Sequence, residues 1–416
     1  MTASGYGRGR PEGRASFPVK DGRRPVKKKA KRGLPQNETA PLFSTDIVRR
    51  MMNAAGLPSD GVNSIIGSGI FRTIDNGVNE MHYDPMEKHL ELMRHAPRTM
   101  KYDGSVPFEQ WQETARQKLA ELLGLPLEMP ESDEFHIEYD EMREDFREIR
   151  FTFASEPLAD VCCYLLLPKE YEGRLPMVIC LQGHTKGCHI SLGRVKYEGD
   201  ELKIGDGDRD FGLQIVRRGQ AALVMEQRAF GERGGNSAGS QCGLPAMSAL
   251  LLGRTLVGER VWDVMRGIDC VTAHFDMIDA GRIALMGQSG GGTVACYAGA
   301  LDERLAAVMP ASSFCGYMES IGVRQHCACN YVPGIMKYFD MGDLAGMTAP
   351  RPMVVVGGTE DPLFPLESAS REFAVAREYY HTAGAPENVR HVIGNGGHRF
   401  YAADAWPVFD EVTGWR

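Results

Sequence analysis

One glycine-rich stretch of the 416-residue sequence could carry out covalent chemistry: GQSGG, residues 287–291. It follows the apolar run 282–286 and precedes a segment, 293–301, that is typical of a helix. In the G-x-S-x-G pattern the serine occupies a sharp turn between a strand and a helix, and the glycines let the two backbones approach closely. Since a serine hydroxyl is a weak nucleophile without a base, Ser289 predicts a histidine and a carboxylate elsewhere in the chain.

Two later segments supply these partners. His398 lies in the glycine-rich stretch NGGH after the last apolar run, and Asp361 follows the apolar run before it. The histidine would accept the serine proton, while the carboxylate would fix its tautomer and stabilise its cation. The order Ser289, Asp361, His398 is that of the α/β-hydrolases. Glu360 is a rival for the acid, but adjacent residues on an extended turn point in different directions, and we favour Asp361.

Attack on a carbonyl creates an oxyanion, which needs preorganised hydrogen-bond donors. The first expected donor is the backbone N–H of Gly290, the residue after the nucleophile. The second should come from the loop after an earlier strand, where the sequence reads LQGHTKG, residues 181–187. We expect the His184 amide in this role, with the Thr185 amide as the fallback.

Three long segments, 185–209, 229–257 and 311–342, exceed the usual loop lengths of α/β units and are expected to rim a substrate pocket. Side chains there could contact substrate or could simply pack. His184 and His326 are also conceivable bases, but neither follows the last expected strand. The pocket candidates are Thr185, Gln288, Tyr317, His326 and Asn330.

The elements that must position these residues begin at about residue 150. From there, short apolar runs bounded by Gly, Pro or polar residues alternate with amphipathic segments, which predicts an α/β fold: a mostly parallel central sheet with helices on both faces. Sites in such sheets lie outside the carboxyl ends of the strands. We expect residues 150–416 to form the catalytic domain, 34–149 an N-terminal helical extension packed on it, and 1–33 a disordered basic tail.

Several segments from about residue 150 to the end resemble the α/β-hydrolase superfamily, in particular its acetyl xylan esterase and dienelactone hydrolase-like group. They are LQGHTKG, MEQRAFGERG, ERVWDVMRGIDCV, GQSGGG, GGTEDPLFP and GGH. The resemblance implies a serine carboxylic-ester hydrolase that acts through an acyl-enzyme on short-chain, in particular acetyl, esters, with carbohydrate esters among the substrates, and needs no cofactor. Two departures stand out: Gln182 precedes the oxyanion-loop glycine where many esterases have histidine, and Ser289 replaces the cysteine of dienelactone hydrolases.

Two other readings of the same residues stay open. One is a serine peptidase of the prolyl oligopeptidase kind, although those enzymes carry a large β-propeller and the N-terminal segment here is short and helical. The other is a catalytically silent binding protein that keeps the fold. The basic tail could bind a polyanion weakly, so nucleic acid is a minor possibility; the oligomeric state is open.

The ten cysteines are expected to be reduced thiols of a cytoplasmic protein, since neither a signal peptide nor a membrane-spanning run is visible. Two sets of residues could be imagined as zinc ligands. One is His326, Cys327 and Cys329, and the other is His184, Cys188 and His189. Because neither set has a second ligand pair at familiar zinc spacing, we expect no metal.

Overall fold

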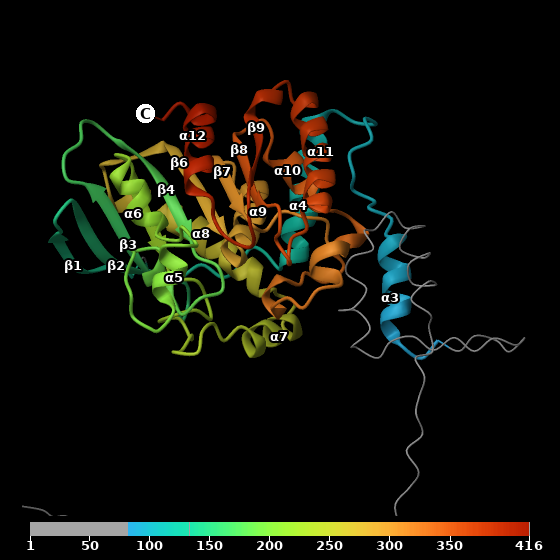
Figure 1. The fold of residues 1–416 in the computed structure, drawn as a ribbon, viewed down its shortest axis with the longest axis horizontal. Helices are drawn as coiled ribbons and strands as arrows, with labels where there is room; N and C mark the ends of the chain where they lie inside the picture. Colours follow the sequence, from blue (N-terminus) through green and yellow to red (C-terminus); the bar gives the residue numbers. More distant parts are fainter. Residues whose placement is uncertain (1–81, 133, 416) are drawn as a thin grey trace, which may run out of the picture. The chain divides into compact units, whose positions relative to one another are not determined.

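The computed structural model describes residues 82–132 and 134–415, so the basic tail expected over 1–33 lies outside the described residues. A nine-stranded sheet forms the centre of this part of the chain, in the order β1-β2-β3-β5-β4-β6-β7-β8-β9 (Figure 1). Strands β5, β4, β6, β7, β8 and β9 run parallel, whereas β1, β2 and β3 join antiparallel at one side. The expected mostly parallel sheet is confirmed.

The strand bounds follow the apolar runs of the sequence closely, because strands buried on both faces need apolar residues at consecutive positions. In β4, for example, Met177 and Ile179 face one core while Val178 and Cys180 face the other. The strands are β1 His136–Met142, β2 Phe146–Glu156, β3 Ala159–Pro168, β4 Leu175–Leu181, β5 Ala221–Met225, β6 Ile278–Gln288, β7 Leu305–Ala311, β8 Met353–Gly358 and β9 Val389–Gly394.

Helices cover both faces of the sheet, as expected (Figure 1). One core contains residues of α4 Phe108–Leu123, α8 Leu256–His274, α9 Gly290–Leu301, α10 Met341–Thr348 and α11 Leu366–Thr382. The opposite core contains residues of α6 Phe211–Arg217 and α12 Ala402–Thr413. The remaining helices of the described ranges are α3 Pro85–Arg94, α5 Asp200–Ile204 and α7 Gly243–Leu251, with short turns η3 Cys188–Ile190, η4 Met318–Gly322, η5 Ala328–Asn330, η6 Ile335–Lys337 and η7 Pro386–Asn388.

Helix α4 shows why the segment before the sheet belongs to the same compact unit. Its Trp111 ring stacks on Tyr379 of α11 with centroids 5.0 Å apart, and its Gln112 amide donates to the carbonyls of Gly346 and Ala349. Gly124 ends the helix in the left-handed conformation, with φ of 77°, where glycine has no steric penalty. The apolar face of this helix, which includes Trp111, Ala115 and Leu119, is therefore buried.

The sheet begins earlier than the expected boundary at residue 150. Strand β1 and the first residues of β2 lie in the segment 34–149, which was expected to be helical, so that expectation is wrong from His136 onward. Strand β1 is almost fully exposed and pairs with β2 through charged residues, including ion pairs of Asp140 with Arg147 and of Glu138 with Arg150. Its stability depends on this pairing, since little apolar surface is buried along it.

None of the helices in the described ranges combines the length and the hydropathy that a bilayer crossing requires.

Candidate active site

Ser289 occupies the sharp turn that the sequence predicts, between the last residue of β6 and the first of α9. Its backbone has φ of 57° and ψ of −120°, a strained conformation that costs a non-glycine residue about 1 to 3 kcal/mol. Two glycines make the turn possible: a Cβ on Gly287 would lie 2.2 Å from the Gly291 carbonyl oxygen, and one on Gly291 would lie 2.2 Å from the Leu181 carbonyl oxygen. The backbone therefore projects the serine at the carboxyl end of the sheet.

Asp361 and His398 form the expected acid–base pair, with His398 Nδ1 2.8 Å from Asp361 Oδ2. The other carboxylate oxygen accepts the amides of Leu363 and Phe364 at 2.9 and 3.1 Å. Burial alone would raise the pKa of Asp361, but the hydrogen bond and charge of His398, with the two amides, lower it overall. Glu360 is exposed, so the structure brings Asp361 rather than Glu360 to the histidine.

The sheet order places the histidine loop beside the nucleophile. Ser289 N donates to the Ala311 carbonyl at 2.8 Å, and the next residue, Ser312, donates its hydroxyl to the Arg399 carbonyl at 2.9 Å. No hydrogen bond joins the Ser289 hydroxyl to His398 among the residues that the structure describes, and such bonds often tighten only when substrate binds. The three proposed catalytic residues thus lie at one edge of the sheet, after β6, β8 and β9.

The expected oxyanion donors are neighbours. A Cβ on Gly183 would lie 2.9 Å from Ser289 Cβ, so the loop after β4 runs directly against the nucleophile. Gly290 is the first residue of α9, where an N–H has no partner within the helix, and a Cβ on it would lie 2.8 Å from Cε1 of His184. Thr185 is buried, and its hydroxyl donates to the Gly187 carbonyl at 3.2 Å, which makes it part of a turn.

His326 is the pocket candidate that lies beside the acid–base pair. Its ring lies 5.2 Å from that of Phe364, and Phe364 in turn stacks on His398 at 5.9 Å. Its Nε2 lies 3.1 Å from the Ser320 hydroxyl. Burial lowers the pKa of His326, so the imidazole is neutral near pH 7 and can accept or donate a hydrogen bond. It stays a candidate for substrate contact.

The three other pocket candidates have different surroundings. The Gln288 side chain is fully buried, and its amide finds no hydrogen-bond partner among the described residues. Tyr317 and Asn330 line a separate cavity of about 930 Å³ along α3, whose lining residues include none of the proposed catalytic residues. The Tyr317 hydroxyl lies 2.8 Å from that of Tyr297. Contact of these three side chains with substrate stays a prediction.

Comparison with known proteins assigns the chain to a family. The model of the Abhydrolase family matches residues 87–400. The chain belongs to the Abhydrolase family. The protein named "Putative hydrolase YtaP" of Bacillus subtilis (strain 168) is 27% identical over 240 residues, which cover 56% of this chain and 77% of that protein.

Solved structures show that members of other esterase groups share the fold of this Abhydrolase family chain. A "putative acetyl xylan esterase" from Bacteroides fragilis NCTC 9343 has a TM-score of 0.63 at 19% identity, covering 75% of this chain and 83% of that one. A glucuronoyl esterase from Solibacter usitatus has a TM-score of 0.60 at 16% identity, covering 77% and 97%. The resemblance to the acetyl xylan esterase-like group is thereby confirmed at the level of the fold.

The loop after β5 of this Abhydrolase chain is fixed by a buried ion-pair network. Arg228 binds Asp263 of α8 with two guanidinium nitrogens and also binds Glu156 of β2. Arg233 binds the same aspartate at 2.6 Å. Burial would raise the pKa of Asp263, but the two arginines lower it to about 2. The network is structural, since each charge has a protein partner.

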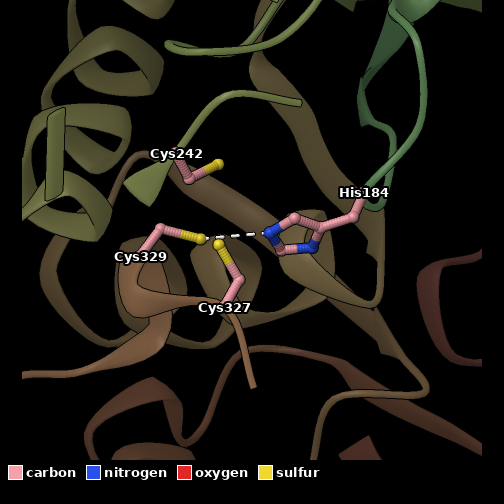
Figure 2. Close-up of side chains that lie close together, drawn as sticks. All are labelled: His184, Cys242, Cys327 and Cys329. Carbon is pink, nitrogen blue, oxygen red and sulfur yellow. Dashed lines mark hydrogen bonds between the residues drawn. The ribbon is translucent and has the colours of Figure 1, made fainter. Parts of the chain in front are cut away.

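A second group of polar side chains converges beside the oxyanion loop. His184, Cys242, Cys327 and Cys329 direct one imidazole nitrogen and three sulfur atoms toward a common point (Figure 2), and these atoms all lie within 4.8 Å of one another. His184 Nε2 lies 3.1 Å from Cys329 Sγ. The sequence analysis placed His184 in one candidate zinc set and Cys327 and Cys329 in the other. It did not identify Cys242 as a candidate ligand.

The other members of those two sets have different partners. His189 Nε2 lies 2.9 Å from Asp200, Cys188 is buried in the sheet core beside α6, and His326 contacts Ser320. All ten cysteines have free thiols in the structure.

Proposed function

We propose that the protein is a serine carboxylic-ester hydrolase that works through an acyl-enzyme. The observation that carries the proposal is the Asp361–His398 hydrogen bond, 2.8 Å long, at the same sheet edge as a serine held in a strained turn. Peptide bonds are open to the same chemistry, but the described part of the chain before the sheet holds two helices, α3 and α4, and no β-propeller. This favours the ester reaction over that of the prolyl oligopeptidases.

In the proposed reaction, Ser289 Oγ attacks the ester carbonyl while His398 Nε2 takes the hydroxyl proton. The amides of Gly290 and His184 hold the oxyanion of the tetrahedral intermediate. His398 then gives its proton to the leaving alcohol, and the acyl group stays on the serine. A water molecule, deprotonated by His398, attacks the acyl-enzyme and releases the carboxylic acid and the free serine. Asp361 holds the histidine in the tautomer that this sequence needs.

We further propose short-chain acyl esters, acetyl esters in particular, as the substrates, with carbohydrates as the alcohol. The support is the fold shared with the putative acetyl xylan esterase and the glucuronoyl esterase, whose names both describe carbohydrate esterases. The two names imply different esters: in an acetylated xylan the sugar supplies the alcohol, whereas in a glucuronoyl ester the sugar supplies the acid. Acetylated xylo-oligosaccharides and methyl glucuronate esters therefore make a discriminating pair of substrates.

The test compares hydrolysis of p-nitrophenyl acetate, butyrate and octanoate by the wild-type protein and by Ser289→Ala, with mass spectrometry after a fluorophosphonate probe. We expect a preference for acetate, loss of activity on substitution and a label on Ser289. A folded wild-type protein that neither hydrolyses these esters nor takes the label would contradict the proposal and favour a binding protein that has kept the fold.

A further inference from the structure

We propose that His184, Cys242, Cys327 and Cys329 bind one Zn²⁺ ion in a closed, structural site that anchors the loop after β4. The proposal departs from the expectation, drawn from the sequence, that the chain needs no metal. The proposal concerns metal binding alone and stands whether or not the protein hydrolyses esters.

The geometry fits zinc. Zn²⁺ in structural sites takes four tetrahedral ligands from cysteine and histidine, and ligand sulfur atoms about 2.3 Å from the metal lie about 3.8 Å from one another. The four ligand atoms here are all within 4.8 Å of one another, so small side-chain rotations bring them onto a tetrahedron. Figure 2 shows that the three sulfur atoms and the imidazole nitrogen point inward from different directions.

The ligands come from three segments that are far apart in the sequence. His184 follows β4, Cys242 immediately precedes α7, and Cys327 and Cys329 flank the start of η5. Burial of the group is substantial: Cys242 and Cys329 are 2% and 1% exposed. A metal held by all three segments would close long loops, and the free energy of binding then stabilises the folded state.

The charge around the group suits a metal site that carries net negative charge. Arg260 of α8 is 2% exposed and donates to Cys242 Sγ at 3.2 Å. Its other hydrogen bonds go to the Arg228 carbonyl, and its guanidinium lies 4.5 Å from the centre of the Phe230 ring. Among the described residues no carboxylate pairs with Arg260, yet a buried cation needs an anionic partner.

A zinc site would supply the negative charge that the buried Arg260 needs. Three thiolates, one neutral imidazole and Zn²⁺ carry a net charge of −1, which the single positive charge of Arg260 balances. On binding, the three thiol protons pass to solvent. The hydrophobic side chains around the site, Phe230, Ala246 and Leu256 among them, would keep water from it. With four protein ligands, no coordination position is left open for catalysis.

The site also has a consequence for the proposed reaction, and this one consequence depends on the proposed function. The His184 ring that would bind zinc lies against Gly290, and the His184 amide is one of the two proposed oxyanion donors. Fixing the ring therefore fixes the amide. Removal of the metal should lower kcat more than it raises KM, because an oxyanion donor acts mainly in the transition state.

The first experiment measures metal in the whole protein, purified without a metal-affinity step, by inductively coupled plasma mass spectrometry. We expect one zinc per chain in the wild type. Cys242→Ala and Cys329→Ala should lose it, whereas Cys162→Ala, at a buried cysteine of β3 outside the group, should retain it. Thermal unfolding should show that chelation destabilises the wild type and Cys162→Ala but changes the other two variants little.

A second measurement keeps the proposal testable if the variants fail to fold. Co²⁺ replaces zinc in the wild-type protein, and a tetrahedral thiolate site then shows thiolate-to-cobalt charge-transfer bands together with strong visible d–d bands. Folded, reduced wild type that contains no zinc and gives no such bands would overturn the proposal. A disulfide between any two of the three cysteines in freshly purified protein would overturn it as well. Zinc-loaded protein without esterase activity would refute only the proposed function.

Discussion

Replacing Asp361 by asparagine tests the proposed catalytic role of the carboxylate while changing one atom. One carboxylate oxygen, Oδ1, accepts the backbone amides of Leu363 and Phe364, and the other accepts His398 Nδ1. In Asp361→Asn the carbonyl oxygen must stay with the two amides, since an NH₂ group there would meet two donors. The NH₂ group then faces His398 Nδ1 and can only donate to it.

The expected fall in kcat follows from this constraint on the asparagine side chain. With Nδ1 accepting, the histidine carries its proton on Nε2, the nitrogen that should take the proton of Ser289. We expect kcat to fall about 10⁴-fold, which is about 5.5 kcal/mol of lost transition-state stabilisation. The variant keeps three hydrogen bonds and loses only their charge, so its free energy of unfolding should fall by only about 1 to 2 kcal/mol.

The assay measures kcat on p-nitrophenyl acetate and urea unfolding for the wild type, Asp361→Asn and the matched control Glu360→Gln. Glu360 is the exposed neighbour, and its substitution should leave both quantities nearly unchanged. A value of kcat for Asp361→Asn within about tenfold of the wild type, a difference of only about 1.4 kcal/mol, would refute the reasoning. Equal losses in both variants would point to a general disturbance of the turn.

Two further predictions concern stability. Arg228→Met should lower the free energy of unfolding in urea by about 3 kcal/mol because it leaves buried carboxylates such as Asp263 short of a partner, whereas Arg217→Met, in a half-exposed pair, should cost under about 1 kcal/mol; equal effects would contradict the structural role of the network. Burial, followed by the charge of Asp340, raises the pKa of Glu372 to about 7, so its contribution to stability is complete below the unfolded-state pKa of about 4.3 and is lost as the pH rises through 7. Glu372→Gln should therefore match the wild type at about pH 4 and exceed it in stability above about pH 8. A constant difference between the two free energies of unfolding across this pH range would contradict the prediction.

The sequence predicts the parallel part of the fold well because burial on both faces leaves a continuous apolar run. The parallel strands β4 to β9 all coincide with such runs, as does the antiparallel strand β3. The residues after β6, β8 and β9 form the proposed catalytic group. Strand β1 carries no such signal: its residues are exposed, and charged side chains dominate it. It forms a strand because β2 offers a partner, which is a tertiary effect that local pattern cannot report.

The same limit applies to the residues around the site. Tyr317 and Asn330 lie in a long segment after a strand, as pocket residues often do, but the chain turns them toward α3. Cys242 has no neighbouring cysteine or histidine to mark it as a ligand. Three loops meet there only because α7, α8 and η5 pack together. The spacing of ligands along the sequence identifies metal sites whose ligands lie within one loop. It does not identify a site whose ligands come from three loops.

Strand β1 also bears on how copies of the protein behave toward one another. The outer strand of a sheet offers unpaired amides and carbonyls that can template another chain, and proteins counter this with charged side chains along that strand. In β1, Glu138 and Asp140 are engaged with arginines of β2, and Glu141 with Arg143. An approaching strand would have to desolvate this row of charges. The antiparallel end of the sheet is thus protected against aggregation by the same residues that make it hard to recognise as a strand.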